Sequence, residues 1–455
     1  MMEDVPASKA QRNRALWLST LAFTVCFAAW TIFSIIGVQI KEDLGLNDTQ
    51  FGLLIGTPIL TGSLVRLVLG IWTDQYGGRI VYTLVMLAAA AATWLLTLAY
   101  DYPTFLLAAL GVGIAGGSFA VGIAYVSRWF PQEQQGTALG IFGAGNVGAA
   151  VTKFLAPMIM VAYGWETVAQ IWALALVIMA AIFWFGTDDE PELKRRKAAG
   201  EKPEPISAML APLKQLQVWR FSLYYFFVFG GFVALALWLP RYYVGVYHLD
   251  IVTAGLLAAA YSIPGSLFRV LGGVLSDRHG ARRVMYWTFT GSVICTFILS
   301  YPATRYIVDG IRGPIEFTFA IKFIPFTCLI FVLGFFMSLG KAAVYKHIPA
   351  FYPNHVGSVG GVVGLIGGLG GFVLPVAFGA MNDLTGVWTS CFMLLSFIAA
   401  GSLLWMHFAI LYAERRRIPE LAGPKYLPEE DILGPVLPAP RSKRAGRARH
   451  AATVG

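Results

Sequence analysis

Two arginines, Arg66 and Arg269, are the residues of this sequence best suited to chemistry, because each lies inside a long apolar segment. Charged residues within membrane spans are costly to bury and usually mark a functional site. The central parts of the apolar segments contain no Asp or Glu that could pair with these arginines. A guanidinium is planar, permanently charged and presents paired donors that fit a planar oxyanion. The two arginines therefore predict a binding site for a small anion.

Two lysines in apolar segments, Lys153 and Lys341, are candidates for proton coupling. Lys153 follows Asn146 by two helical turns, so both are expected on one face of a helix. Burial and the expected nearness of the arginines would both disfavour a charged ammonium, so this lysine could lose and regain a proton. Lys341 lies towards the cytoplasmic end of its segment. The alternative is that each lysine reaches a polar interface or a helix end.

The composition indicates an all-α membrane protein. Of the 455 residues, 57% are hydrophobic and only 13% are charged, whereas soluble domains carry about 25% charged residues. A helix needs about 20 apolar residues to cross the hydrocarbon core, and about twelve such segments occur. They cover residues 17–40, 50–73, 79–99, 104–127, 135–162, 165–186, 219–245, 252–276, 283–302, 321–345, 355–380 and 386–413.

The charged residues predict how these segments are oriented. Most Lys and Arg fall on one side if the N-terminus is cytoplasmic, as the positive-inside rule requires, so the net charge of +9 reflects topology and not nucleic-acid binding. Both termini are then cytoplasmic, and the loop 303–320 is external. The expected parts are a cytoplasmic N-terminus (1–16), a six-helix bundle (17–186), a cytoplasmic linker (187–216), a second six-helix bundle (217–413) and a cytoplasmic, disordered tail (414–455).

The remaining reactive residue types indicate neither a metal site nor an enzyme. The four cysteines lie in predicted spans and form no C-x-x-C pair, and four of the six histidines lie in or near different loops. No set of nucleophile and base is recognisable in the sequence. We therefore expect no metal, no cofactor and no catalytic residues.

The two halves of the chain repeat each other. Residues 62–66 (GSLVR) match residues 265–269 (GSLFR) at an offset of 203, which makes the two arginines equivalent positions. The same offset relates two further pairs, Asp74 with Asp277 and Arg79 with Arg282. Parallel repeats of this kind place a substrate site near the middle of the bilayer, between the halves.

Two motifs carry a resemblance to a known family. Residues 74–79 (DQYGGR) and 277–282 (DRHGAR) are similar to the loop motif of the major facilitator superfamily, and the glycine-rich segments 136–148 and 357–371 are similar to the paired signatures of its nitrate/nitrite porter (NarK-type) family. The resemblance covers residues 15–413. It implies the major facilitator fold, with twelve transmembrane helices in two pseudo-symmetric six-helix bundles, and transport of nitrate or nitrite.

The resemblance also implies a substrate site. In the family the corresponding arginines bind the ion, two aromatic residues sandwich it, and polar side chains lie beside it. The residues that match are Arg66, Arg269, Phe119, Phe229, Tyr225 and Asn146. Taken alone, a single Phe in a membrane helix usually only packs, and Tyr224 is the alternative to Tyr225.

Two further sets of residues have mechanical roles by this interpretation. Glycines allow helices to approach and slide, so we expect rocking surfaces for alternating access, with static close packing as the alternative. These glycines are Gly140, Gly143, Gly145, Gly148, Gly364, Gly367, Gly368 and Gly371. The resemblance implies a latch between helices at their cytoplasmic ends, with solvated loop charges as the alternative; its residues are Asp74, Arg79, Asp277 and Arg282.

The membrane potential decides which transport modes can import the ion. A potential negative inside opposes anion entry by about 2.3 kcal/mol per charge per 100 mV, so import requires proton symport or exchange for an outgoing anion. Residues 17–23 and 31–37 and the Lys153 segment resemble the nitrate/proton symporter subgroup more than the exchangers. We therefore predict nitrate/proton symport across the inner membrane by a functional monomer. The alternatives are a nitrate/nitrite antiporter and, from another class, a membrane anion sensor without transport.

Overall fold

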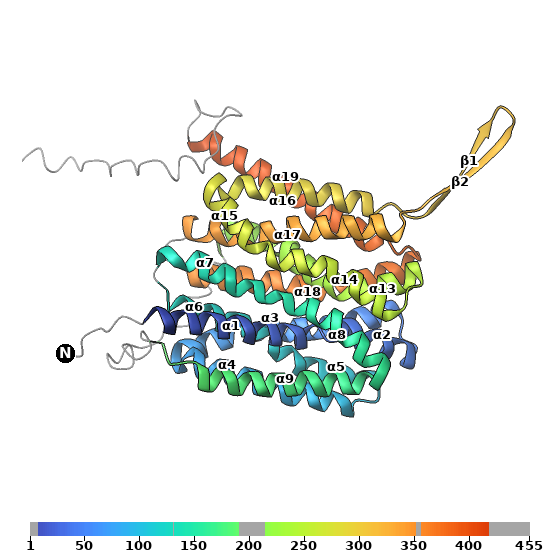
Figure 1. The fold of residues 1–455 in the computed structure, drawn as a ribbon. Helices are drawn as coiled ribbons and strands as arrows, with labels where there is room; N and C mark the ends of the chain where they lie inside the picture. The colour runs from blue at the N-terminus through green and yellow to red at the C-terminus, as the bar shows by residue number, and fades with distance from the viewer. Residues whose placement is uncertain (1–7, 131, 191–213, 352–355, 418–455) are drawn as a thin grey trace, which may run out of the picture. The chain divides into compact units, whose positions relative to one another are not determined.

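The computed structural model describes residues 8–130, 132–190, 214–351 and 356–417. Within these ranges twelve long helical segments follow one another, and ten of them have the length and hydropathy of a membrane span. The other two are α3 (Asp48–Tyr76) and α16 (Ala281–Leu299). Each segment overlaps one predicted span, so the helical membrane fold predicted from the sequence is confirmed (Figure 1).

Several of the twelve segments consist of more than one helix. In chain order, the elements besides α3 and α16 are α1 (Lys9–Trp30), α2 (Phe33–Leu44), α4 (Gly78–Leu95), η1 (Leu96–Leu98), α5 (Tyr102–Val112), η2 (Gly113–Gly117), α6 (Ser118–Ser127), α7 (Gln132–Gly143), η3 (Ala144–Val147), α8 (Gly148–Tyr163), α9 (Trp165–Gly186), α12 (Leu216–Tyr225), η5 (Phe226–Gly231), α13 (Phe232–Tyr247), α14 (Ile251–Leu267), α15 (Arg269–His279), α17 (Phe323–Phe351), α18 (Val356–Thr385) and α19 (Ser390–Arg417).

Three spans contain a 3₁₀ or π-helical turn near their middle. The 3₁₀ turns η2 and η3 interrupt the fourth and fifth spans, and the π-helical turn η5 interrupts the seventh. Irregular turns inside helices frequently occur at functional sites. Phe119 follows η2 closely, Asn146 lies in η3 and Phe229 lies in η5, so the three interruptions coincide with residues of the predicted substrate site.

The sequence repeat is visible in the helix boundaries. Gly77 separates α3 from α4 and Gly280 separates α15 from α16, at the offset of the repeat. Both have a positive φ, 95° and 81°, which glycine adopts readily because it has no Cβ. The copies differ at the arginines, since α3 continues through Arg66 whereas α14 ends at Leu267 and a new helix begins at Arg269.

The predicted loop 303–320 differs from expectation. It forms an antiparallel hairpin of β1 (Thr304–Gly310) and β2 (Gly313–Phe319), which extends away from the helices (Figure 1). β-branched and aromatic residues, which favour strands, occupy much of it. The spans are therefore helical as predicted, and the hairpin is a local addition between the ninth and tenth spans.

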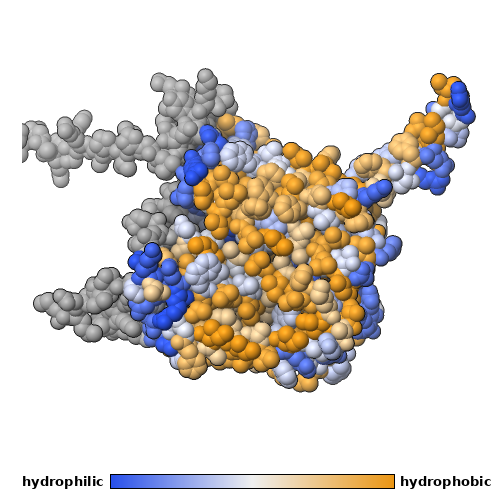
Figure 2. All heavy atoms as spheres, in the orientation of Figure 1, coloured by the Kyte–Doolittle hydropathy of each residue, from blue (hydrophilic) through white to orange (hydrophobic). Residues whose placement is uncertain are grey.

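The two halves meet closely along α3 and α18. A Cβ on Gly52 would lie 2.2 Å from the carbonyl oxygen of Pro375, and a Cβ on Gly379 would lie 2.1 Å from that of Asp48. Glycine permits this approach of backbones in membranes. Hydrophobic residues cover much of the helical surface in view, as lipid contact requires (Figure 2).

The predicted boundaries between the parts of the chain are only partly visible. α1 begins at Lys9, within the predicted N-terminal segment 1–16. Most of the predicted linker and tail, 191–213 and 418–455, lies outside the described residues. The chain through Trp405 forms one compact unit, and a second unit begins at Met406 within α19.

Candidate functional site

The structure brings the two arginines together around one phenylalanine. The guanidinium carbon of Arg66 lies 5.2 Å from the ring centroid of Phe119, and that of Arg269 lies 5.6 Å from the same ring. Arg66 and Phe119 come from the first half (α3 and α6), and Arg269 comes from the second (α15). Both arginines are buried, so two cations from different halves share one enclosed site.

Arg66 is held by both halves. Its Nε donates to the carbonyl oxygen of Gly116 (3.4 Å) and its Nη1 donates to that of Gly364 in α18 (3.0 Å). Its guanidinium also lies over Trp30 and Phe229, at 5.6 and 5.4 Å from the ring centroids. The Trp30 indole donates in turn to Pro58 (2.8 Å), so a rigid frame fixes Arg66.

Arg269 is held less tightly. Its Nη1 is buried, and no group among the described residues accepts a hydrogen bond from it. Its guanidinium lies 5.9 Å from the ring centroid of Tyr345. No described carboxylate forms an ion pair with Arg269 or with Arg66. A buried donor without an acceptor is costly, so an anion would satisfy Arg269.

The aromatic rings of the site form a stack. Phe119 and Phe229 have ring centroids 6.3 Å apart and planes inclined by 22°. Tyr225 extends the stack, since it lies 5.1 Å from Phe229 with planes inclined by 6°. A flat ion between two rings needs about 7 Å, twice a van der Waals contact of about 3.5 Å. Phe119 and Phe229 would therefore have to separate only slightly to hold a planar ion.

Tyr345 belongs to the site but was not predicted. Its ring packs edge-on against Tyr225 (5.0 Å), and its hydroxyl donates to the carbonyl oxygen of Gly360 (3.2 Å). The Tyr225 hydroxyl lies close to Arg269, although no described group completes a hydrogen bond of normal geometry with it. Tyr345 lies one helical turn after Lys341 in α17, and this spacing is the sequence signal that could have identified it.

Asn146 has an unusual environment for a buried amide. Its side chain is fully buried, yet neither its oxygen nor its nitrogen has a hydrogen-bond partner among the described residues. Buried polar groups are almost always satisfied. The amide therefore has a donor and an acceptor available for a substrate or a water molecule.

The predicted glycines divide into three groups. A Cβ on Gly143 would lie 3.1 Å from the Arg269 guanidinium, and a Cβ on Gly368 would lie 3.1 Å from Arg66 Nη1 and 2.4 Å from Ser63 Oγ. Each signature thus makes room for the arginine of the other half. Gly371 also meets the other half, at Ile59. Gly145, Gly148, Gly364 and Gly367 have their nearest neighbours in their own half, and Gly140 has no neighbour within 4 Å.

Both candidate lysines are fully buried, which excludes the interpretation that they reach a polar interface. Lys153 Nζ donates to Ala149 O and to Ser262 Oγ, both at 3.1 Å. Lys341 Nζ donates to Gly265 O and lies 3.5 Å from the ring centroid of Phe232. Lys341, and not Lys153 as expected, is close enough to Arg269 for their charges to repel.

Two of the predicted latch residues contact another helix of their own half. Asp277 pairs with Lys346 of its own half, and both side chains are more than half exposed. Arg79 donates to Trp184 O (3.1 Å from Nε and 2.6 Å from Nη2) and stacks on the Trp184 ring, also within one half. Arg282 is buried. The side-chain placement of Asp74 lies outside the described part of the chain.

A buried carboxylate that the sequence did not reveal lies at this end of the first half. Glu190 accepts from the backbone N–H of Gly78 (2.9 Å) and from Arg128 Nη1 (3.4 Å). Burial raises the pKa of the Glu190 carboxyl despite these donors. The group connects α4, α6 and the end of the sixth span.

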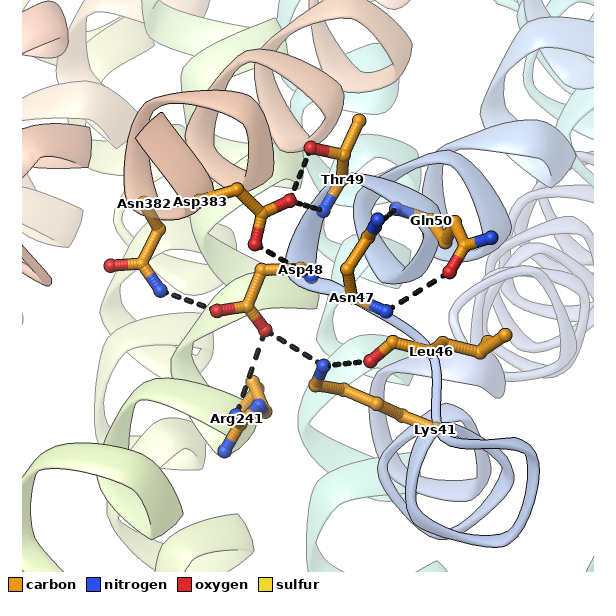
Figure 3. Close-up of polar contacts among 9 residues, drawn as sticks. All are labelled: Lys41, Leu46, Asn47, Asp48, Thr49, Gln50, Arg241, Asn382 and Asp383. Carbon is orange, nitrogen blue, oxygen red and sulfur yellow. Dashed lines mark hydrogen bonds and ion pairs between the residues drawn. The ribbon is translucent and has the colours of Figure 1, made fainter. Parts of the chain in front are cut away.

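A polar cluster joins the halves at the opposite end of α3 (Figure 3). Asp48 pairs with Lys41 (3.0 Å) and with Arg241 of α13 (3.6 Å), and Asn382 of α18 donates to it. Asp383 accepts from the backbone N–H groups of Asp48 (3.1 Å) and Thr49 (2.7 Å). A carboxylate is favourable at a helix N-terminus, so this cluster fastens α3 to the second half.

No group of three or more His, Cys, Asp or Glu among the described residues could hold a metal ion.

The sequence was also compared with models of known protein families. The sequence profile of the Major Facilitator Superfamily matches residues 18–311 and 247–444.

Curated proteins that are similar over most of their length include two transporters. The chain is 46% identical over 418 residues to a "Probable nitrate/nitrite antiporter NarK1" of Thermus thermophilus, covering 89% of this chain and 93% of that protein. It is 28% identical over 397 residues to a "Nitrite extrusion protein" of Bacillus subtilis (strain 168), covering 86% and 94%.

Among solved structures, a bacterial homolog of the human lysosomal transporter Spinster, in an inward-facing and occupied conformation, has a TM-score of 0.62 at 17% identity. The match covers 89% of this chain and 97% of that one. At this identity the likeness supports the fold alone.

Proposed function

Because the chain belongs to the major facilitator superfamily, within the group of NarK-type nitrate/nitrite porters, we propose that it imports nitrate across the inner membrane by alternating access, coupled to protons. Its multi-pass architecture and its family are those of transporters, and we propose that nitrate crosses without chemical change. Both termini are proposed to lie in the cytoplasm, and the monomer is proposed as the functional unit.

The observation that carries the proposal is the pair of buried arginines with no described acidic partner. Two like charges in a low-dielectric site repel each other, and one anion between them relieves both. The nearly parallel rings of Phe119 and Phe229 favour a planar ion. Nitrate and nitrite are planar and singly charged, and the names of both curated relatives refer to nitrate or nitrite.

Proton coupling is supported by the position of Lys341. Protonation of the buried Lys341 is opposed by burial and by Arg269, and an anion at Arg269 would offset the second of these effects. Nitrate binding would thus favour protonation of Lys341, and protonation would favour nitrate binding by the same factor. This reciprocity is what symport requires. Lys153, bonded to Ser262 across the two halves, is the second candidate for the coupling group.

A second candidate function is exchange of nitrate for nitrite. The name of the Thermus relative, a probable nitrate/nitrite antiporter, favours it. An exchanger also overcomes the membrane potential, because one anion leaves for each that enters, and it needs no titrating group.

Uptake of labelled nitrate into proteoliposomes separates these functions. Under symport, a pH gradient that is acidic outside drives accumulation without internal nitrite. Stimulation by internal nitrite alone would show exchange instead. Binding without flux under either condition would show a sensor and overturn transport.

The same assay tests the lysines. Lys341→Gln is expected to retain nitrate counterflow but to lose accumulation driven by the pH gradient. Lys153→Gln is the matched variant, since it removes an equally buried ammonium that is not close to Arg269. If both variants kept the full response to the pH gradient, neither lysine would be the coupling group.

A further inference from the structure

The hairpin of β1 and β2 has two chemically different faces. The register pairs Thr304 with Phe319, Tyr306 with Phe317 and Val308 with Ile315, and directly opposed residues share a face. This apolar face is ordered, since the rings of Tyr306 and Phe317 stack at 5.2 Å. The other face includes Asp309 and the ion pair of Arg305 with Glu316.

Apart from the contact of Phe319 with Tyr301 at its base, the apolar face is exposed in the described chain. Ile315, Phe317 and Phe319 are 58%, 51% and 50% exposed, and Ile311 at the turn is fully exposed. An isolated two-stranded hairpin is only marginally stable in water and needs a surface to pack on. Figure 2 shows hydrophobic and hydrophilic residues side by side along the hairpin.

The apolar face is continuous with the lipid-facing surface of the helices. Tyr301, at the end of α16, packs edge-on against Phe319 at 5.1 Å. Phe323 and Ile324, at the start of α17, are exposed on the other side of the hairpin's base. Tyr247 of α13 donates to Ile321 O (2.9 Å) and holds this base at the end of the spans. The hairpin thus leaves the helices at the ends of α16 and α17.

From this geometry we propose that the hairpin lies on the bilayer surface, with its apolar face in the interface between headgroups and acyl chains. Tyr and other amphipathic rings are favoured at this depth. The charges of the hairpin balance, since Arg305 and Arg312 are matched by Asp309 and Glu316. The apolar face therefore provides the attraction, and anionic lipid is not required.

Lipid is favoured as the partner of the apolar face, over a second copy of the chain or a soluble protein, because the hairpin is tethered close to the bilayer. Only residues 300–303 and 320–322 connect the hairpin to α16 and α17, so the membrane surface is always within its reach. Such a tether gives a high effective concentration that a separate molecule lacks.

A fluorescent label on each face of β2 tests the proposal. Ile315→Cys places the label on the apolar face, and Thr318→Cys is the matched control on the polar face. Both are made with Cys328→Ser, because Cys328 is the exposed native thiol and Cys26, Cys295 and Cys391 are buried. The full-length protein is labelled with an environment-sensitive dye and placed in nanodiscs holding one molecule each, with or without spin-labelled lipid.

The expected result is a blue-shifted emission and severalfold stronger quenching by interfacial spin labels at position 315 than at 318. Equal, solvent-like signals at both positions would overturn the proposal. Protection at position 315 that appears only at high protein density in liposomes would assign the face to a second copy. Nitrate flux of the labelled protein is measured in parallel, so that failure of the proposed transport is distinguished from failure of the hairpin's docking.

Discussion

The surroundings of Arg66 and Arg269 differ, although the two arginines are equivalent in the sequence repeat. Arg66 lies within a continuous helix, donates to carbonyl oxygens of both halves and lies near three rings. Arg269 is the first residue of a helix, and its Nη1 has no acceptor among the described residues. Two arginines at equivalent positions of a sequence repeat can therefore have different surroundings in the structure.

The difference indicates a division of roles. The bond of Arg66 to Gly364 crosses from one half to the other, so Arg66 is suited to closing the site. Arg269 has one donor, Nη1, without an acceptor among the described residues, so we propose that it serves binding and coupling. The predictions below test this division in order of decreasing effect.

Arg269→Gln should weaken nitrate binding most. A buried charged partner contributes about 2 kcal/mol or more, so the dissociation constant should rise at least ~30-fold. Arg66→Lys retains the charge but cannot keep both carbonyl contacts, and should lower turnover with a smaller change in affinity. Equilibrium binding and counterflow rates of both variants measure the contrast. Equal losses of affinity in the two variants would remove the proposed division.

Asp48→Asn should loosen the polar cluster at the N-terminal end of α3, because it leaves Lys41 and Arg241 without their carboxylate. We expect the equilibrium to shift by about 2 kcal/mol away from the arrangement in which this end is closed. The readout is the labelling rate, by an impermeant thiol reagent, of a cysteine at Thr57, which is buried between the cluster and Arg66.

The control for this variant is Asp43→Asn, which makes the same charge change at an exposed residue that accepts a hydrogen bond from Gln39. It should leave labelling unchanged. Equal labelling in both variants would mean that the cluster does not close the site over the arginines.

Alanine substitutions in the two glycine-rich segments, 136–148 and 357–371, should again affect the two arginines differently. In Gly368→Ala the new methyl group would meet Ser63 and Arg66, whereas in Gly143→Ala it would meet only Arg269 at 3.1 Å. Displacing packed groups costs about 1–3 kcal/mol. We expect about tenfold slower counterflow for Gly368→Ala and a smaller, affinity-based loss for Gly143→Ala. Gly140→Ala, which has open space, should behave like the unaltered protein.

The smallest effects are expected from the residues that support each arginine. Trp30→Phe removes the hydrogen bond to Pro58 beside Arg66, and Tyr345→Phe removes the one to Gly360 beside Arg269. Each bond contributes about 1 kcal/mol, so severalfold changes are expected, in turnover for Trp30→Phe and in affinity for Tyr345→Phe. If both variants changed the same kinetic parameter, the proposed separate roles of Arg66 and Arg269 would be contradicted.

Much of the fold follows from local properties of the sequence. Each apolar segment is long enough to span a bilayer, and a helix satisfies its own backbone there, so the spans could be placed without knowledge of their neighbours. The sequence did not predict the hairpin, because an average hydropathy does not reveal the alternation of apolar and polar residues that marks a strand. The segment was therefore interpreted as a loop between two spans. The latch between helices stays a prediction, and Asp277 and Arg79 each contact another helix of their own half.

The sequence alone determined that two equivalent arginines lie in apolar spans and that no central carboxylate could neutralise them. Charge and periodicity along the chain suffice for that. Only the tertiary structure decided that each arginine lies against a glycine signature of the other half, that Lys341 and not Lys153 is close to Arg269, and that Asp48 fastens α3 to α18. These contacts join residues that are far apart in the sequence, and they depend on how closely helices approach, which small side chains permit but do not specify.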